Sequence, residues 1–197
     1  YFAPGWNGAV DGQLASSGSR DADGALQLAV DLRELGGSLR GRRLSGHARL
    51  AMQGASAARP HSDFEGAAEL ALGDSRIQAE GRLDERIELD ARFSPLQLAD
   101  LLPDASGQLR GTLRVRGPRQ APDIAAELDG ASLRWAGYAA SSLELRGRLP
   151  WSGDGGALAL RAGGVQAGVA LDSLRVDAGG AVENLRVDAA ASSEAIG

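Results

Sequence analysis

Apolar and polar residues alternate along most of this chain, and this period of two is the feature that most limits how the chain can fold. Residues 86–93 show it most clearly, with one side made of Ile87, Leu89, Ala91 and Phe93 and the other of Arg86, Glu88, Asp90 and Arg92. Successive side chains of a strand point to opposite faces, so the pattern predicts strands with one apolar and one solvated face. The alternation recurs in residues 26–33, 76–84 and 109–116. The sequence therefore predicts a mainly β fold built on an antiparallel sheet.

Glycine spacing leaves room for one short helix. The chain has 28 glycines, and residues 82–106 form its one stretch of 25 residues without glycine. In that stretch Ser94 can cap a helix, Pro95 suits its first position and Gln97 suits its third. The spacing predicts a short, capped amphipathic helix over residues 94–105, ended by proline. A helix of two turns needs packing to be stable, so its leucines are expected to dock on an edge or mouth of the sheet; they are Leu98, Leu101 and Leu102.

Turns are predicted at Asp-Gly dipeptides, which tolerate positive φ in hairpins. These are Asp11-Gly12, Asp23-Gly24, Asp129-Gly130 and Asp154-Gly155. Residues 21–24 also superficially match a calcium loop, but the acidic positions and distal glutamate of an EF-hand are incomplete. We therefore expect a turn there.

Composition excludes several classes of protein and site. The 21 basic residues are all arginine, so a P-loop, a Schiff-base lysine and a Ser-x-x-Lys nucleophile are excluded. The chain has no cysteine, and its formal charge of −5 argues against a nucleic-acid partner. His47 and His61 stand without an acid or serine at motif spacing. We expect no catalytic residue, no metal site and no cofactor.

A shift of 99 residues aligns the chain with itself. The aligned positions pair Pro4 with Pro103, Gly8 with Gly107, Val10 with Leu109, Gly12 with Gly111, Leu14 with Leu113 and Gly18 with Gly117. With an insertion, residues 39–42 also match residues 145–148. This predicts a repeat unit over residues 1–93, the junction helix over 94–105 and a second unit over 106–197, joined in one continuous structure.

The junction carries a family resemblance. The run from Leu96 to Gly111, LQLADLLPDASGQLRG, resembles the repeat signature of the TamB family, in the wider AsmA-like group. The continuations Leu113–Gly117 and Ala121–Ile124, together with Gly137 and Leu143–Leu145, fit the same pattern, and residues 2–8 resemble the junction one unit earlier. The resemblance covers essentially the whole chain. It suggests an internal or C-terminal piece of a longer protein.

The resemblance implies a long antiparallel sheet curled into a U-shaped trough, a β-taco, with an apolar concave face. It implies a periplasmic segment of an inner-membrane-anchored protein in a Gram-negative bacterium. It further implies a role in moving phospholipid between the two membranes, or in assembling outer-membrane proteins and autotransporters with a TamA-type barrel partner. The family pattern carries no catalytic residues.

The residues themselves favour a hollow trough. The inward set consists of leucine, valine, alanine and glycine, and aromatic residues make up only 4% of the chain, so small side chains leave the concave face unfilled. We expect ten to fourteen strands, about 4.8 Å apart, to span roughly 50–65 Å. The candidate lipid-lining residues are Val10, Leu14, Leu26, Leu28, Val30, Leu32, Leu50, Leu70, Leu72, Ile77, Leu83, Ile87, Leu89, Phe93, Leu109, Leu113, Val115, Leu128, Leu133, Trp135, Leu143, Leu145, Leu158, Leu160, Val169, Leu171, Val176, Leu185 and Val187.

Alternatives remain for both fold and function. The sheet could instead close as a barrel or a sandwich. Separately, aromatic residues such as Trp135 and Trp151 are expected to serve as core or rim packing rather than as ligand contacts, with Trp135 pointing inward in phase with Leu133. In function, phospholipid transport competes with the templating of nascent outer-membrane strands at the sheet edges. An extracellular β-solenoid adhesin is a third hypothesis, and an enzyme is a distant fourth. The scarcity of asparagine, limited to Asn7 and Asn184, counts against the adhesin.

Overall fold

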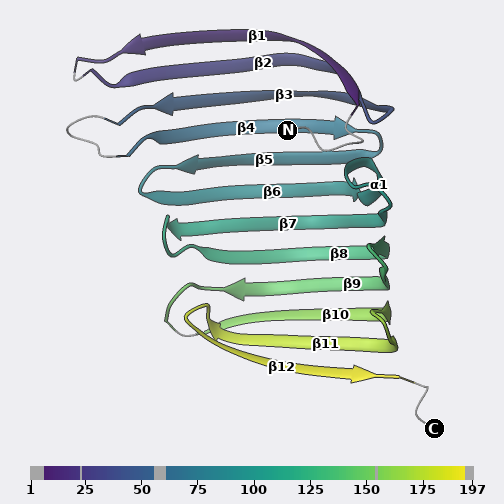
Figure 1. Ribbon diagram of the computed structural model, residues 1–197. Coiled ribbons are helices and arrows are strands. Elements are labelled where there is room, and N and C mark those ends of the chain that lie inside the picture. The colour runs from purple at the N-terminus through teal and green to yellow at the C-terminus, as the bar shows by residue number, and fades with distance from the viewer. Residues whose placement is uncertain (1–6, 23, 56–60, 154, 194–197) are drawn as a thin grey trace.

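The computed structural model describes residues 7–22, 24–55, 61–153 and 155–193. Twelve strands and one helical turn follow one another along this part of the chain (Figure 1). The strands are β1 (Gly8–Arg20), β2 (Leu26–Leu39), β3 (Arg42–Gln53), β4 (Asp63–Leu72), β5 (Ser75–Leu83), β6 (Arg86–Gln97), β7 (Ser106–Pro118), β8 (Asp123–Trp135), β9 (Tyr138–Leu149), β10 (Gly156–Gln166), β11 (Ala170–Ala181) and β12 (Asn184–Ser192). The helix α1 (Leu98–Leu101) lies between β6 and β7.

The strands form one open, curled sheet in which each strand pairs antiparallel with the next, from β1 to β12. The predicted mainly β, trough-like fold is confirmed. Twelve strands at about 4.8 Å spacing span roughly 53 Å from one edge to the other. Within the described residues β1 and β12 do not pair with each other, so the alternatives of a closed barrel and of a sandwich are wrong. The meander also differs from the coil of a β-solenoid.

Two of the predicted turns are wrong. Asp11-Gly12 lies inside β1 and Asp129-Gly130 lies inside β8. The alternation of the strand explains Gly130, which occupies a position on the apolar face. A Cβ there would lie 2.7 Å from Leu133 Cδ1, so this position needs glycine inside a strand rather than in a turn. The other two pairs fall between strands, with Asp23 and Asp154 outside the described residues. At the first of these the Asp21 carboxylate accepts the Ala25 N–H at 2.9 Å, as expected for a turn rather than a calcium loop.

The helix is shorter than predicted and begins later. It spans Leu98–Leu101, and its N-cap is Gln97 with no side-chain capping bond. Residues 94–97 instead continue β6, where Leu96 pairs with Leu109 and Gln97 pairs with Gln108 of β7. Ladder pairing with β7 therefore prevails over the expected Ser94 cap.

Part of the predicted internal alignment is also wrong. Arg40 and Gly41 form the β2–β3 turn, with φ of 54° and 72°, whereas residues 145–148 lie inside β9. The corresponding turn of the second half is Ala136-Gly137, between β8 and β9, with φ of 50° and 85°. Within the described residues, six strands precede α1 and six follow it. The boundaries 1–93, 94–105 and 106–197 stay a prediction.

Candidate functional site

The candidate site is the apolar face of the sheet. Paired residues of an antiparallel ladder lie on the same face, so the strand register traces this face across the molecule. One row runs through Leu14, Leu32, Ala48, Ala68, Ala79, Ala91, Leu113, Ala126, Gly147, Leu158, Ala178 and Val187. The neighbouring row runs through Leu70, Ile77, Phe93, Gly111, Leu128, Leu145, Leu160, Val176 and Ala189. Both rows are uncharged along their whole length.

The structure places most of the predicted lining residues together on this face. Val169 lies in the turn between β10 and β11 rather than in a strand, because Ala167 N–H bonds the Val169 carbonyl at 3.0 Å. Leu133 stays on the face beyond a register shift in β8, close to Leu109 and Leu143 around Gly130. Trp135 was expected to pack inward, but it ends β8 opposite Tyr138 and both rings are exposed. Whether these residues contact lipid stays a prediction.

Sequence reasoning missed several members of the same face. Most of them continue the alternation at the strand ends and could have been found by extending it: Leu44, Met52, Phe64, Ile124 and Leu149. Val165 was hidden by Gly164, whose φ of 57° breaks the alternation in β10. No periodicity argument recovers a residue beyond such a break.

The apolar face is not filled by the described chain. The buried hydrophobic residues are few and mostly alanine, namely Ala25, Leu72, Leu96, Ala105, Ala126, Ala162, Val165 and Ala181. In contrast, Leu50 of β3 stays 44% exposed. A covered sheet face normally buries such side chains. This face therefore has room for an apolar partner.

A groove of about 520 Å³ lies on this face over β3–β6. We call it the central groove, and on the apolar face it is lined by Ala48, Leu50, Phe64, Gly66, Ala68, Ala79, Gly81, Leu83, Ile87 and Leu89. Its floor is low because three alanines and two glycines stand side by side on adjacent strands. Phe64, Leu83 and Ile87 rise beside that floor. The lining offers apolar contact and almost no polar group.

The opposite face is charged and self-paired. Arg146 binds Asp129 at 2.7 Å, and this bond raises the pKa of Arg146. The Arg148 guanidinium, with a second bond from the Trp151 N–H at 3.1 Å, holds the pKa of Asp123 below its usual range. A larger hollow of about 810 Å³ lies on this face, and it is lined by positively charged arginines and negatively charged carboxylates. Because those charges bind each other, the hollow presents no single recognition chemistry.

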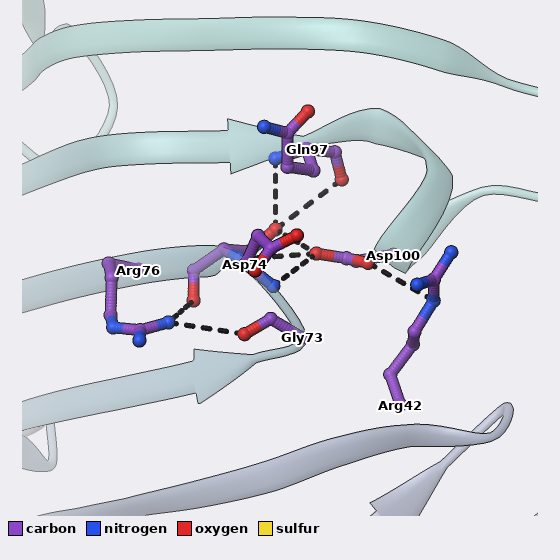
Figure 2. Close-up of polar contacts among 7 residues, drawn as sticks. Arg42, Gly73, Asp74, Arg76, Gln97 and Asp100 are labelled. Carbon is purple, nitrogen blue, oxygen red and sulfur yellow. Dashed lines mark hydrogen bonds and ion pairs between the residues drawn. The ribbon is translucent and has the colours of Figure 1, made fainter.

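One end of the apolar face is closed by a compact polar cluster. We call it the rim cluster; it consists of Arg42, Gly73, Asp74, Ser75, Gln97 and Asp100 (Figure 2). Asp100, in α1, is 2% exposed and accepts bonds from the Asp74 and Ser75 N–H groups at 3.1 Å and from Ser75 Oγ at 2.8 Å. Ser75 is fully buried and its Oγ also accepts the Gln97 N–H at 2.9 Å. Arg42 Nε lies 3.4 Å from the second oxygen of Asp100.

The rim cluster corrects the expected docking of α1. The residue that α1 buries is Asp100, whereas Leu102, just after the helix, remains exposed. No sequence motif announced this anchor, since Ser75 and Asp100 lie 25 residues apart. All the polar atoms of the Asp100 carboxylate are used by the chain itself, so the cluster is structural.

The described residues hold no group of three or more potential metal ligands. His47 and His61 are both exposed. Among the helices of the described residues, none is long and apolar enough to span a bilayer.

Comparison with protein-family models gives a match over the full sequence. The sequence model of the family described as TamB, N-terminal domain, matches residues 1–197. The sequence had suggested an internal or C-terminal piece, whereas the matched description is of the N-terminal domain. No solved structure matches the chain.

Proposed function

The chain belongs to the TamB family of envelope proteins, and from this premise we propose that it is a non-enzymatic segment that carries phospholipid acyl chains along its apolar face. In this proposal the lipids move between the inner and outer membranes. The observation that carries the proposal is the open apolar face, which crosses twelve strands and is left uncovered by the described chain.

The energetics favour an acyl guest. Burying apolar surface contributes about 25 cal/mol per Å², or roughly 0.8 kcal/mol per methylene. A lipid that leaves a bilayer loses that contact with other acyl chains, and a continuous apolar face restores it at each step along the sheet. The uncharged rows support movement from strand to strand, because no bound chain has to pass a charge. The polar headgroup stays in water at the open side of the trough.

The cellular setting of the proposal comes from the family. We place the segment in the periplasm of a Gram-negative bacterium, within a longer chain anchored in the inner membrane. A TamA-type outer-membrane barrel is the proposed partner of that longer chain. The charged outer face supports a water-exposed position, since it carries arginine and carboxylate side chains in ion pairs.

Lipid analysis of the purified chain tests the proposal. We expect phospholipid to co-purify with the wild-type chain and to be detected by mass spectrometry after extraction. Ala79→Arg puts a charge on the floor of the central groove and should abolish this lipid. Gln78→Arg is the matched control, because it adds the same charge to the next residue of β5, on the opposite face.

Both variants need comparable circular dichroism for the comparison to count. Leu28, Leu89 and Leu113 give further sites for the arginine on other strands, and Leu89 is already partly exposed. A wild-type chain without lipid and without uptake of fluorescent phospholipid would contradict the proposal. Equal lipid in the Ala79→Arg and Gln78→Arg proteins would contradict the assignment to this face.

A second candidate function is favoured by the sheet edges. Every residue of β1 and of β12 is exposed, so both edges offer backbone groups to an added strand. Such edges could template the strands of nascent outer-membrane proteins. Photo-crosslinkers placed in β1 and β12 separate the two functions: capture of unfolded outer-membrane protein supports templating, and capture of lipid alone at the central groove supports transport.

A further inference from the structure

Two aromatic side chains at the tip of the β8–β9 hairpin are left in water. Trp135 ends β8 and Tyr138 begins β9, and the two residues pair directly across their turn, at the α1 end of the strands (Figure 1). They are 53% and 62% exposed, whereas every other aromatic residue of the described chain is half-buried. Aromatic rings contribute most to stability or binding when they are covered. The pair is therefore a candidate contact for a partner.

The turn between the two aromatic residues fixes their arrangement. Ala136 and Gly137 both have positive φ, of 50° and 85°, as in the type I′ turns that close two-residue hairpins. Such a turn keeps its flanking residues directly opposed, so Trp135 and Tyr138 share one side of the ladder. A Cβ at Gly137 would meet nothing within 4 Å, so the tip has open space around it.

The aromatic pair continues the apolar face to its end. Leu133 precedes Trp135 by two residues and lies on that face, close to Gly130. Along the hairpin Leu133 pairs with Ala140, and the next pair on the same side is Trp135 with Tyr138. No charged side chain separates the leucines of the face from the two rings. A ligand on the apolar face can therefore reach both rings directly.

The charge of this hairpin end differs from that of the chain as a whole. Arg134 is the one charged residue in the sequence from 130 to 143, whereas the chain has a net charge of −5. Arg134 is exposed, and within the described residues it forms no ion pair. The hairpin end therefore favours a ligand with a negatively charged group.

Trp151, at the other end of β9, provides a contrast within the same molecule. Its indole Nε1–H donates to Glu183 at 3.1 Å, and its backbone N–H donates to Asp123 at 3.1 Å. Among the residues that the structure describes, neither Trp135 Nε1 nor Tyr138 Oη has a hydrogen-bond partner. The chain uses the polar groups of Trp151 for its own packing, and it leaves those of Trp135 and Tyr138 to a ligand.

We propose that Trp135 and Tyr138 bind the boundary between the headgroup and the acyl chains of a phospholipid whose acyl chains lie on the apolar face. Indole and phenol rings have an apolar body and a hydrogen-bond donor at one edge, and for this reason they gather at the same level of a bilayer. Their donors bind the ester and phosphate oxygens of the lipid. Arg134 favours the negative charge of the phosphate.

The length of an acyl chain matches the strand beneath it. The hydrocarbon of one leaflet is about 15 Å deep, which is half of the bilayer core, and a strand rises about 3.3 Å per residue. An acyl chain that starts at Trp135 therefore lies along β8 from Leu133 to about Leu128. The inference rests on the proposed function, because it needs a lipid on this face.

Depth-dependent quenching of single-tryptophan proteins tests the site. The chain has three tryptophans, at positions 6, 135 and 151. One protein carries Trp6→Phe and Trp151→Phe, and its matched control carries Trp6→Phe and Trp135→Phe. Each protein is loaded with phosphatidylcholine brominated either next to the ester or near the terminal methyl, and is then separated from all vesicles by gel filtration. Mass spectrometry measures the bound lipid before fluorescence is read.

The two proteins should respond differently to the two lipids. In the protein that keeps Trp135, bromines next to the ester should quench the fluorescence about twofold or more relative to terminal bromines, since the two positions differ in depth by roughly 10 Å. In the control, Trp151 should show no such preference, because its indole is already bound to Glu183.

The outcomes separate this site from the proposed function. Lipid-loaded protein in which both lipids quench Trp135 equally, or terminal bromines quench it more, overturns the site and leaves lipid binding by the face intact. Quenching of Trp135 that needs vesicles shows contact with a bilayer surface and also overturns it. A blue shift of Trp135 emission that grows with protein concentration in the absence of lipid shows that a second copy covers the pair, and overturns it too. A chain that takes up no lipid at all contradicts the proposed function, and this site falls with it.

Discussion

The rim cluster and the central groove belong to the same sheet, yet they are built in opposite ways. At the rim, Ser75 and Asp100 are buried, and the Asp100 carboxylate accepts hydrogen bonds from the chain itself. A few residues away, Ala68 and Ala79 form an apolar floor with open space above it. The chain can therefore pack tightly with the residues it has. The groove is open because the side chains of its floor are too small to fill it, and not because the whole fold is loosely packed.

This contrast separates stability from function along the sheet. Substitutions at the rim act on interactions that the chain completes itself, so they should appear in the free energy of unfolding. Substitutions in the groove act on a surface that awaits a guest, so they should affect binding more than stability.

Asp100→Ala should have the largest effect on stability. It leaves the N–H groups of Asp74 and Ser75 without their acceptor, and the buried Ser75 hydroxyl keeps only its longer bond to the Gln97 carbonyl, at 3.4 Å. Orphaned buried polar groups of this kind cost about 3 kcal/mol in the free energy of unfolding. Urea denaturation measures the loss. Asp74→Ala is the matched control, because it removes the same charge from an exposed position beside the cluster and should cost less than about 0.5 kcal/mol.

Leucine truncation should show the difference between the regions directly. Leu72 at the rim is 6% exposed, whereas Leu50 in the groove is 44% exposed. Leu72→Ala should cost about 2–3 kcal/mol, as for a buried leucine, and Leu50→Ala about 1 kcal/mol. Equal losses in urea denaturation would mean that the groove is packed as tightly as the rim.

A glycine pair gives a smaller and more local comparison. Gly73 and Gly41 both have positive φ, of 57° and 72°. A Cβ at Gly73 would lie 2.7 Å from Asp100 Oδ1, whereas nothing lies within 4 Å of a Cβ at Gly41. Gly73→Ala should therefore destabilise the chain by about 1 kcal/mol more than Gly41→Ala, since both share the same backbone strain. Similar thermal midpoints for the two variants would contradict the tight contact.

The pH dependence should be the smallest effect, because it comes from the exposed outer face. Arg148 and the Trp151 N–H lower the pKa of Asp123 in the folded chain. A lowered pKa stabilises the fold above the unfolded value of about 3.9, and that contribution is lost as pH falls through the folded value. Stability should be level from neutral pH down to about 5 and fall below about 4. Asp123→Asn should flatten part of that fall in urea midpoints measured across the range.

The alternation of residues was enough to predict the sheet, its antiparallel pairing and the shared face of nearly all candidate residues. Ile87, Leu89 and Phe93 were recovered because a strand in a regular ladder keeps its phase. The phase fails where the backbone inserts a residue. Gly164 with positive φ hid Val165, and the ladder of β6 with β7 overrode the capping signal at Ser94.

The rim cluster could not be predicted because nothing local encodes it. Ser75 begins a strand and Asp100 sits in a helical turn, and they meet only once the β4–β5 turn folds against α1. Asp11-Gly12 and Asp129-Gly130 failed for the opposite reason. Their local turn preference was real, but a glycine on the apolar face of a strand serves the packing of neighbouring leucines instead.

The central claim is that the apolar face holds acyl chains, and a photoactivatable phospholipid with its reactive group near the acyl terminus tests it most directly. After illumination of the wild-type chain, mass spectrometry locates the labelled residues. The account predicts labels on apolar-face residues of β3–β6, such as Ala68, Ala79 and Leu89, and not on their outward neighbours Gln78 and Glu88. Labels spread equally over both faces, or no label at all, would contradict it.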